Sequence, residues 1–300
     1  MPASRARPRP TAAAIRPRAA PRAGTASSPA CTAEPGAVST LLRWLRGLRA
    51  RPDPLIDPER WRRVATGLPW VAALDAERDA RLSSLAARFL ATKAITPVDD
   101  LHLDDDDRCA LAALCCLPLL EFGAEGLHGW SELIVYPAAF RVERRHTDAG
   151  DVVGLDVVHE GDDELIGEAW DHGPLVLSWA DVRADIADPT AGFCVAAHEM
   201  AHKLDALDGA MDGTPPLPRA WQRTWARDFQ RAYDAFVETV DADLGHAGEG
   251  MAIDPYAAES PEEFFAVCTE YHFGAPDLLR EAFPDVATHL ARFYGPAPLA

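Results

Sequence analysis

Residues 195–207 read VAAHEMAHKLDAL and place His198 and His202 four positions apart in an apolar segment. On a helix, residues four apart lie on one face, one turn above the other. Two imidazoles placed in this way can converge on one Zn²⁺ at about 2.0–2.1 Å. The Glu199 carboxylate points slightly aside, so it can reach a water at the metal without ligating the metal. The segment therefore predicts a catalytic zinc site, with His198 and His202 as ligands and Glu199 as general base.

A catalytic zinc takes three protein ligands, so the third must come from another part of the chain. A histidine six residues after His202 would complete a related motif, but position 208 is Asp. Glu263 is the candidate, at the start of a predicted helix that Ser260 caps. The same spacing fits a capping box, in which Glu263 folds back on the cap amide, and spacing alone leaves both roles open. Glu270 shares a helical stripe with Glu263, and burying two carboxylates there requires a cation or a histidine between them, which favours the ligand role.

Three features near this motif each allow a functional and an ordinary structural interpretation. Asp205 continues the histidine face, where it either orients a ligand imidazole or is a plain acid near a helix end. Tyr256 precedes the Glu263 helix and either stabilises an oxyanion or packs in the core. The strand predicted at 175–179 is either an exposed edge that pairs with an extended peptide or an interior strand. The sequence leaves these alternatives open.

The order of the expected elements predicts an α+β fold. Residues 1–38 read as a disordered, basic tail rich in Ala, Pro and Arg, and residues 39–298 as a zinc metallopeptidase domain. The first part of the domain, about 39–125, is a helical layer, and the catalytic part follows at about 126–298. In the catalytic part, short β-branched and aromatic runs predict a small, mostly antiparallel sheet. Strands are expected at 132–136, 140–143, 155–158 and 175–179. Helices are expected at 41–48, from Asp57-Pro58, and at 75–93, 107–121, 188–207, 219–243, 260–272 and 276–294.

Charge and composition exclude several classes of protein. The chain has 47 acidic and 29 basic side chains, a formal net charge of −18. Residues 1–51 have a net charge of +9, so the rest of the chain has a net charge of −27. Such an acidic domain is poorly suited to binding nucleic acids. The longest uncharged apolar run, 109–120, is 12 residues, against about 20 for a membrane span. The sequence also has no secretory signal and no disulfide pattern among its 6 cysteines, so we expect a cytoplasmic monomer that binds neither nucleic acid nor membrane.

With these motifs the sequence resembles the Mlc titration factor A family of zinc-dependent peptidases, over roughly residues 40–295. The matching blocks are VYPAAF (135–140), GEAW (167–170), GPLVLSW (173–179), HEMAHKLD (198–205), IDPYAA (253–258), PEEFFAV (261–267) and EY (270–271). One departure is His272, where the family usually has Phe.

The resemblance implies a zincin-like metallopeptidase domain, similar to the catalytic domain of anthrax lethal factor. It assigns one Zn²⁺ per chain to His198, His202 and Glu263, the base to Glu199, and a place near the active site to Tyr256. It also implies aminopeptidase activity and binding of the glucose-responsive repressor Mlc.

Two functions remain as alternatives. The chain is either a zinc peptidase acting on peptides or proteins, or a binding protein that sequesters a transcriptional repressor around a structural or vestigial zinc site. The enzyme is favoured, because a structural zinc is usually closed by four Cys or His ligands.

Overall fold

The computed structural model describes residues 54–138, 173–242 and 251–299. They belong to one unit of the chain, Pro52–Ala300. The expected tail, the helix at 41–48 and the strands at 140–143 and 155–158 lie outside the described residues. None of the helices in the described ranges combines the length and the apolar character that a membrane span needs.

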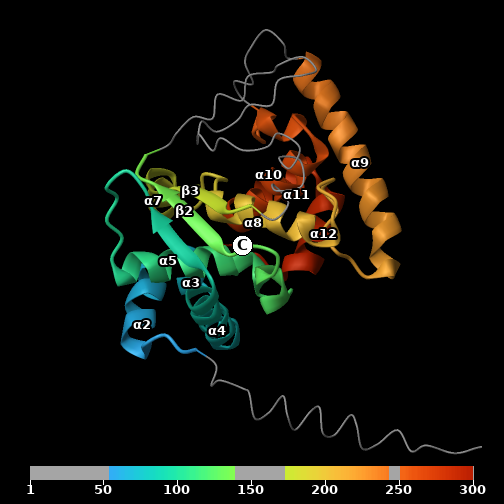
Figure 1. Cartoon of the computed structure of the whole chain (residues 1–300). Coiled ribbons are helices and arrows are strands. Elements are labelled where there is room, and N and C mark those ends of the chain that lie inside the picture. Colours follow the sequence, from blue (N-terminus) through green and yellow to red (C-terminus); the bar gives the residue numbers. More distant parts are fainter. Residues whose placement is uncertain (1–53, 139–172, 243–250, 300) are drawn as a thin grey trace, which may run out of the picture. The chain divides into compact units, whose positions relative to one another are not determined.

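A layer of helices opens the described part of the chain (Figure 1). It consists of α2 (Pro58–Gly67), α3 (Pro69–Ala72), α4 (Ala76–Thr92) and α5 (Asp105–Cys116), followed by the 3₁₀ turns η1 (Leu117–Leu119) and η2 (Ala124–Leu127). The longer helices start on Asp57, Asp75 and Asp104, whose carboxylates accept main-chain N–H groups of the first turn. This confirms the helix start predicted at Asp57. The cysteines of α5 are buried free thiols, and α5 lies against both α4 and α8.

The sheet has three described strands, β1 (Ala94–Pro97), β2 (Glu132–Tyr136) and β3 (Leu175–Ser178), in the order β1-β2-β3. Both pairings are parallel, with Ile95 opposite Leu133 and Leu133 opposite Leu175. The predicted mostly antiparallel sheet is therefore wrong. Parallel neighbours need a long crossover, and α5 with its 3₁₀ turns supplies the crossover between β1 and β2. The sequence pattern gives no signal for β1, which is short and ends in a proline, and without β1 this crossover cannot be inferred.

Helices α7 (Trp179–Ala187) and α8 (Val195–Asp205) follow β3 directly. Trp179, expected to end the strand, instead begins α7, and the Ser178 hydroxyl caps it by accepting the Asp181 N–H at 3.2 Å. The single helix expected over 188–207 is also corrected, because a turn occupies the residues before Val195. The predicted stop is confirmed: α8 passes into the 3₁₀ turn η3 (Ala206–Asp208), and Gly209 closes it with a left-handed φ of +90°.

The C-terminal helices surround α10 (Pro261–Gly274) (Figure 1). They are α9 (Arg219–Ala242), α11 (Pro276–Ala282) and α12 (Pro284–Tyr294), and the 3₁₀ turn η4 (Pro255–Ala258) precedes α10. Every residue of α10 from Phe264 onward is buried, and its aromatic rings pack against Trp225 and Phe229 of α9. The helix starts as predicted, with Ser260 as cap and a proline in first position. Since α10 also lies directly against α8, two helices distant in sequence form the centre of the fold.

His272 is buried in α10 with 3% of its surface exposed. Burial, assisted by the charge of Arg78, lowers its pKa to about 4. An unfolded histidine titrates at about 6.5, so between pH 6.5 and 4 the unfolded chain binds a proton that the folded chain does not. His272 therefore lowers the free energy of unfolding as pH falls through this window.

Between pH 7.5 and pH 5 we expect the free energy of unfolding of the wild type to fall by about 2 kcal/mol more than that of His272→Phe, which has no buried imidazole to protonate. Denaturant titrations of both chains at both pH values, with a chelator present, measure this difference. His102→Phe is the control, because His102 is exposed and its replacement removes no buried neutral imidazole. An equal pH dependence in wild type and His272→Phe would contradict the assignment.

Candidate metal centre

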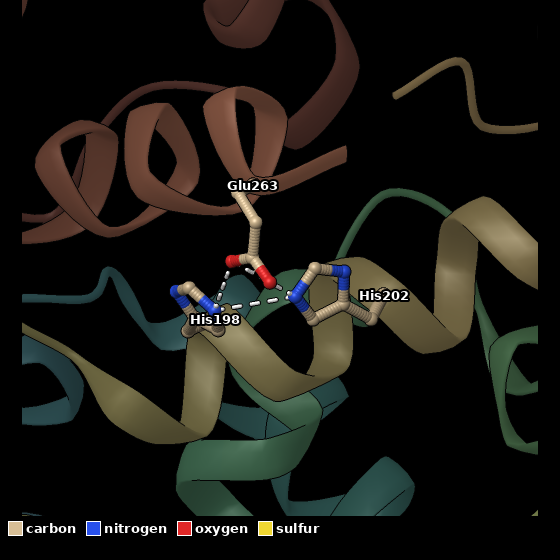
Figure 2. Close-up of side chains that lie close together, drawn as sticks. All are labelled: His198, His202 and Glu263. Carbon is tan, nitrogen blue, oxygen red and sulfur yellow. Dashed lines mark hydrogen bonds and ion pairs between the residues drawn. The ribbon is translucent and has the colours of Figure 1, made fainter. Parts of the chain in front are cut away.

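The two histidines of the HEMAH segment lie one turn apart on α8 and face the same side (Figure 2). Their Nε2 atoms are 3.2 Å apart, and the ring centroids are 4.9 Å apart. Both side chains are largely buried, with 9% of His198 and 14% of His202 exposed. The helical spacing inferred from the sequence thus brings the two ring nitrogens together.

Glu263 reaches the same point from the first turn of α10, as Figure 2 shows. Its Oε2 lies 3.2 Å from His198 Nε2 and 3.5 Å from His202 Nε2. Ser260 caps α10 by accepting the main-chain N–H of Glu263 at 3.3 Å. The cap thus uses the main chain of Glu263, and its carboxylate is turned toward the imidazoles.

The spacing of the three donor atoms fits a zinc ion. Bonds of about 2.0–2.2 Å in a tetrahedral site place neighbouring ligand atoms about 3.3–3.6 Å apart. The three separations found here are 3.2, 3.2 and 3.5 Å. Two imidazoles and one carboxylate also form a donor set that catalytic zinc sites use. Within the described residues, His198, His202 and Glu263 are the group of His, Cys, Asp or Glu side chains close enough to share a metal ion.

The three side chains perturb one another's ionisation. Burial lowers the pKa of His198, but the charge of Glu270 and hydrogen bonds to Glu263 and Glu270 outweigh it and raise the pKa to about 10. Burial raises the pKa of Glu263, but hydrogen bonds from both imidazoles outweigh it and hold that pKa well below its ordinary value. The cluster therefore favours a positive charge at its centre, which a proton or a metal cation can supply.

Glu270 orients His198 from behind. Its Oε1 lies 2.7 Å from His198 Nδ1, and its Oε2 accepts the N–H of Cys194 at 2.8 Å, at the start of α8. A carboxylate on Nδ1 fixes the ring tautomer and directs Nε2 to a metal. Asp185 holds the same helix end by accepting the N–H of Val195 at 2.8 Å, and burial raises its pKa to about 6. The helical stripe predicted that Glu270 needed a cation or a histidine, but not which one, and nothing in the sequence indicated Asp185.

Asp205 does not orient an imidazole, so the functional interpretation considered from sequence is wrong. It is fully buried, and its Oδ2 accepts the N–H of Gly213 at 2.7 Å in the loop after α8. His202 Nδ1 has no hydrogen-bond partner among the described residues. Burial raises the pKa of Asp205 to about 7.

Glu199 and Tyr256 are the two other residues expected to act at this centre. Glu199 follows His198 on α8 and is half-buried. Tyr256 lies in η4, and its ring centroid is 6.2 Å from that of His198, with the planes inclined by 30°. Asp254 fixes this turn by accepting the N–H of Tyr256 at 2.9 Å. The structure thus brings Tyr256 beside His198, although the two residues are far apart in sequence.

β3 lies against α8 and pairs with β2 along one edge. No strand in the described ranges pairs with its other edge. β3 thus packs on the helix that carries the two histidines, and it is the strand considered from the sequence for binding an extended peptide.

Comparison with known proteins places the chain in a family. The family model for the glucose-regulated metallo-peptidase M90 matches residues 42–295. Mlc titration factor A of Pectobacterium atrosepticum is 39% identical over 244 residues, 81% of this chain and 88% of that protein. The proteins of the same name from Escherichia fergusonii and Yersinia pestis are 38% and 39% identical, over 84% and 79% of this chain and 91% and 84% of their own lengths. The chain therefore belongs to the glucose-regulated metallopeptidase M90 family.

Proposed function

We propose that the chain is a zinc-dependent peptidase whose metal is held by Nε2 of His198, Nε2 of His202 and a carboxylate oxygen of Glu263. The observation that carries the proposal is the triangle of donor atoms, 3.2, 3.2 and 3.5 Å on a side, held between two packed helices. Three protein ligands leave a fourth position open, which catalytic zinc requires and structural zinc lacks.

When bound, zinc supplies Lewis acidity that polarises the scissile carbonyl and makes water more acidic. Glu199 then takes the proton from the attacking water and later delivers it to the leaving amine. Tyr256 donates its phenolic hydrogen to the oxyanion that develops on the carbonyl. Glu270 holds the His198 ring in the tautomer that leaves Nε2 free for the metal.

The substrate we propose is a peptide or protein segment bound in extended form. We expect the edge of β3, which lies against α8, to present main-chain N–H and C=O groups to such a backbone, whatever its side chains. Aminopeptidase-like action is the finer form of this proposal.

A second function is favoured by the relatives, which are named Mlc titration factor A. We propose that the chain also binds a transcriptional repressor of the Mlc type. The alternative to a peptidase is that the chain only sequesters the repressor and cleaves no bond. Binding uses a surface and peptidase chemistry uses Glu199, so the two functions are separable by mutation.

The primary test is metal content together with zinc removal. We expect one zinc per chain by elemental analysis, loss of aminoacyl-anilide hydrolysis after chelation, and recovery when zinc is restored. Mg²⁺ is the control, because it prefers six oxygen ligands and does not suit two imidazoles. Full hydrolysis by metal-free chain would overturn the proposed mechanism.

A further inference from the structure

Gly213 is buried in the loop between α8 and α9, where the backbone leaves no room for a side chain. Its φ is +79°, and a Cβ added to it would lie 2.5 Å from the carbonyl oxygen of Pro261 and 3.0 Å from the carbonyl carbon. Ordinary contacts of a Cβ begin near 3.4 Å. Pro261 is the first residue of α10, so Gly213 lies directly against the turn that carries Glu263.

The main chain of Gly213 is fixed on both sides. Its N–H donates to Oδ2 of Asp205 at 2.7 Å, and its carbonyl accepts the indole N–H of Trp225 at 3.3 Å. Asp205 is the last residue of α8, one turn after His202, and is fully buried. Trp225 is also fully buried and packs edge-on against Phe265 of α10. One residue of the loop thus connects the end of α8 to the start of α10.

We propose that Asp205, Gly213 and Pro261 form a clasp that sets the spacing between His202 and Glu263 and thereby the metal affinity of the centre. Asp205 lies three residues after His202, and Pro261 lies two residues before Glu263. Nε2 of His202 and Oε2 of Glu263 are 3.5 Å apart. Metal–ligand distances in working sites vary by only about 0.2 Å. A shift of several tenths of an ångström in the first turn of α10 is therefore enough to weaken binding. Asp205 and Gly213 are positioning residues that act through His202 and Glu263.

Gly213→Ala against Gly209→Ala tests the clasp. Both glycines lie in the loop after α8 with left-handed φ, +79° and +90°, so alanine strains the backbone at either position. Only at Gly213 does the methyl group meet α10, since nothing lies within 4 Å of a Cβ added at Gly209. We expect Gly213→Ala to lower zinc affinity about 10–100-fold, the range found when residues that orient metal ligands are lost, and Gly209→Ala to stay within about 3-fold. Competition with a chromophoric chelator measures both.

Asp205 gives a second test that adds no bulk. Asp205→Ala removes the acceptor for the Gly213 N–H, whereas Asp205→Asn keeps an oxygen that can accept it. We expect Ala to lower zinc affinity at least about 10-fold and Asn to restore most of it. The visible absorption of the Co²⁺-substituted chains reports ligand geometry directly, and we expect it to change in Gly213→Ala and Asp205→Ala but not in Gly209→Ala.

The clasp rests on the proposed metal centre but not on peptidase activity. The experiments therefore distinguish a wrong metal centre from a wrong clasp. If the wild-type chain takes up no zinc or cobalt, the centre itself is wrong. If it binds zinc and Gly213→Ala matches Gly209→Ala in affinity and cobalt spectrum, the clasp is overturned. The same holds if Asp205→Ala binds zinc as tightly as Asp205→Asn, which decides the case even where Gly213→Ala does not fold.

Discussion

Replacing Glu199 with Gln is expected to leave zinc content unchanged and to lower kcat/KM for aminoacyl anilides by a factor of about 10²–10⁴. The amide has the shape of the carboxylate, but it cannot accept a proton near neutral pH. The donor atoms of His198, His202 and Glu263 lie 3.2–3.5 Å apart and none of them belongs to Glu199, so we expect the donor triangle to stay intact. Metal analysis and steady-state kinetics on the same preparation separate binding from catalysis.

The matched control is Glu262→Gln, which removes the same charge from α10 beside the proposed ligand Glu263. We expect its kcat/KM to stay within about 3-fold of the wild type, because Glu262 is absent from the donor group and has no role in proton transfer. Turnover by Glu199→Gln within a factor of a few of the wild type would remove Glu199 from the mechanism. Loss of zinc in that variant would instead show that Glu199 supports the site.

Glu199→Gln also distinguishes a peptidase from a protein that only binds a repressor. If the chain acts by sequestration, Glu199→Gln captures an Mlc-type repressor and releases it from DNA as the wild type does. If the function is cleavage of the repressor, the wild type produces repressor fragments, whereas Glu199→Gln binds the repressor and produces none. Fragment analysis of the repressor with wild type and variant in parallel identifies which outcome applies.

The histidine pair could be predicted from the sequence because its geometry is local. Residues four apart on a helix face one way in almost any context, and α8 forms between Val195 and Asp205 as the apolar pattern suggests. The role of Glu263 cannot be predicted from the sequence in the same way, because a metal ligand and a capping-box residue have the same spacing from Ser260. Only the packing of α10 against α8 turns its carboxylate toward the imidazoles.

The remaining features depend on contacts between distant segments, which periodicity does not encode. Helical periodicity relates Asp205 only to its helix neighbours, whereas its carboxylate accepts the N–H of Gly213 in the loop after α8. The helical stripe marks Glu270 as a costly buried charge, but its partner His198 lies 72 residues away in the sequence. The relative direction of the strands cannot be read from their own residues either, because it depends on where the crossover through α5 returns.

Removal of the Glu263 carboxylate is expected to have the largest effect on the metal centre. Glu263→Ala takes away one of three protein ligands, so zinc affinity should fall by more than the roughly 10–100-fold found for residues that only orient ligands. Its backbone N–H still donates to Ser260, so the start of α10 and the fold should persist. Chelator competition measures the affinity, and circular dichroism of the metal-free chain checks the fold.

Glu262→Ala is the matched control, since it removes a neighbouring carboxylate from the same first turn and the same helix-dipole interaction. A fall in zinc affinity in Glu263→Ala alone assigns the loss to coordination rather than to a weaker helix start. Equal affinities in the two variants would leave the centre with two imidazoles as its only protein ligands among the described residues. Two ligands cannot hold a catalytic zinc tightly, and the proposed peptidase chemistry would then have no metal to work with.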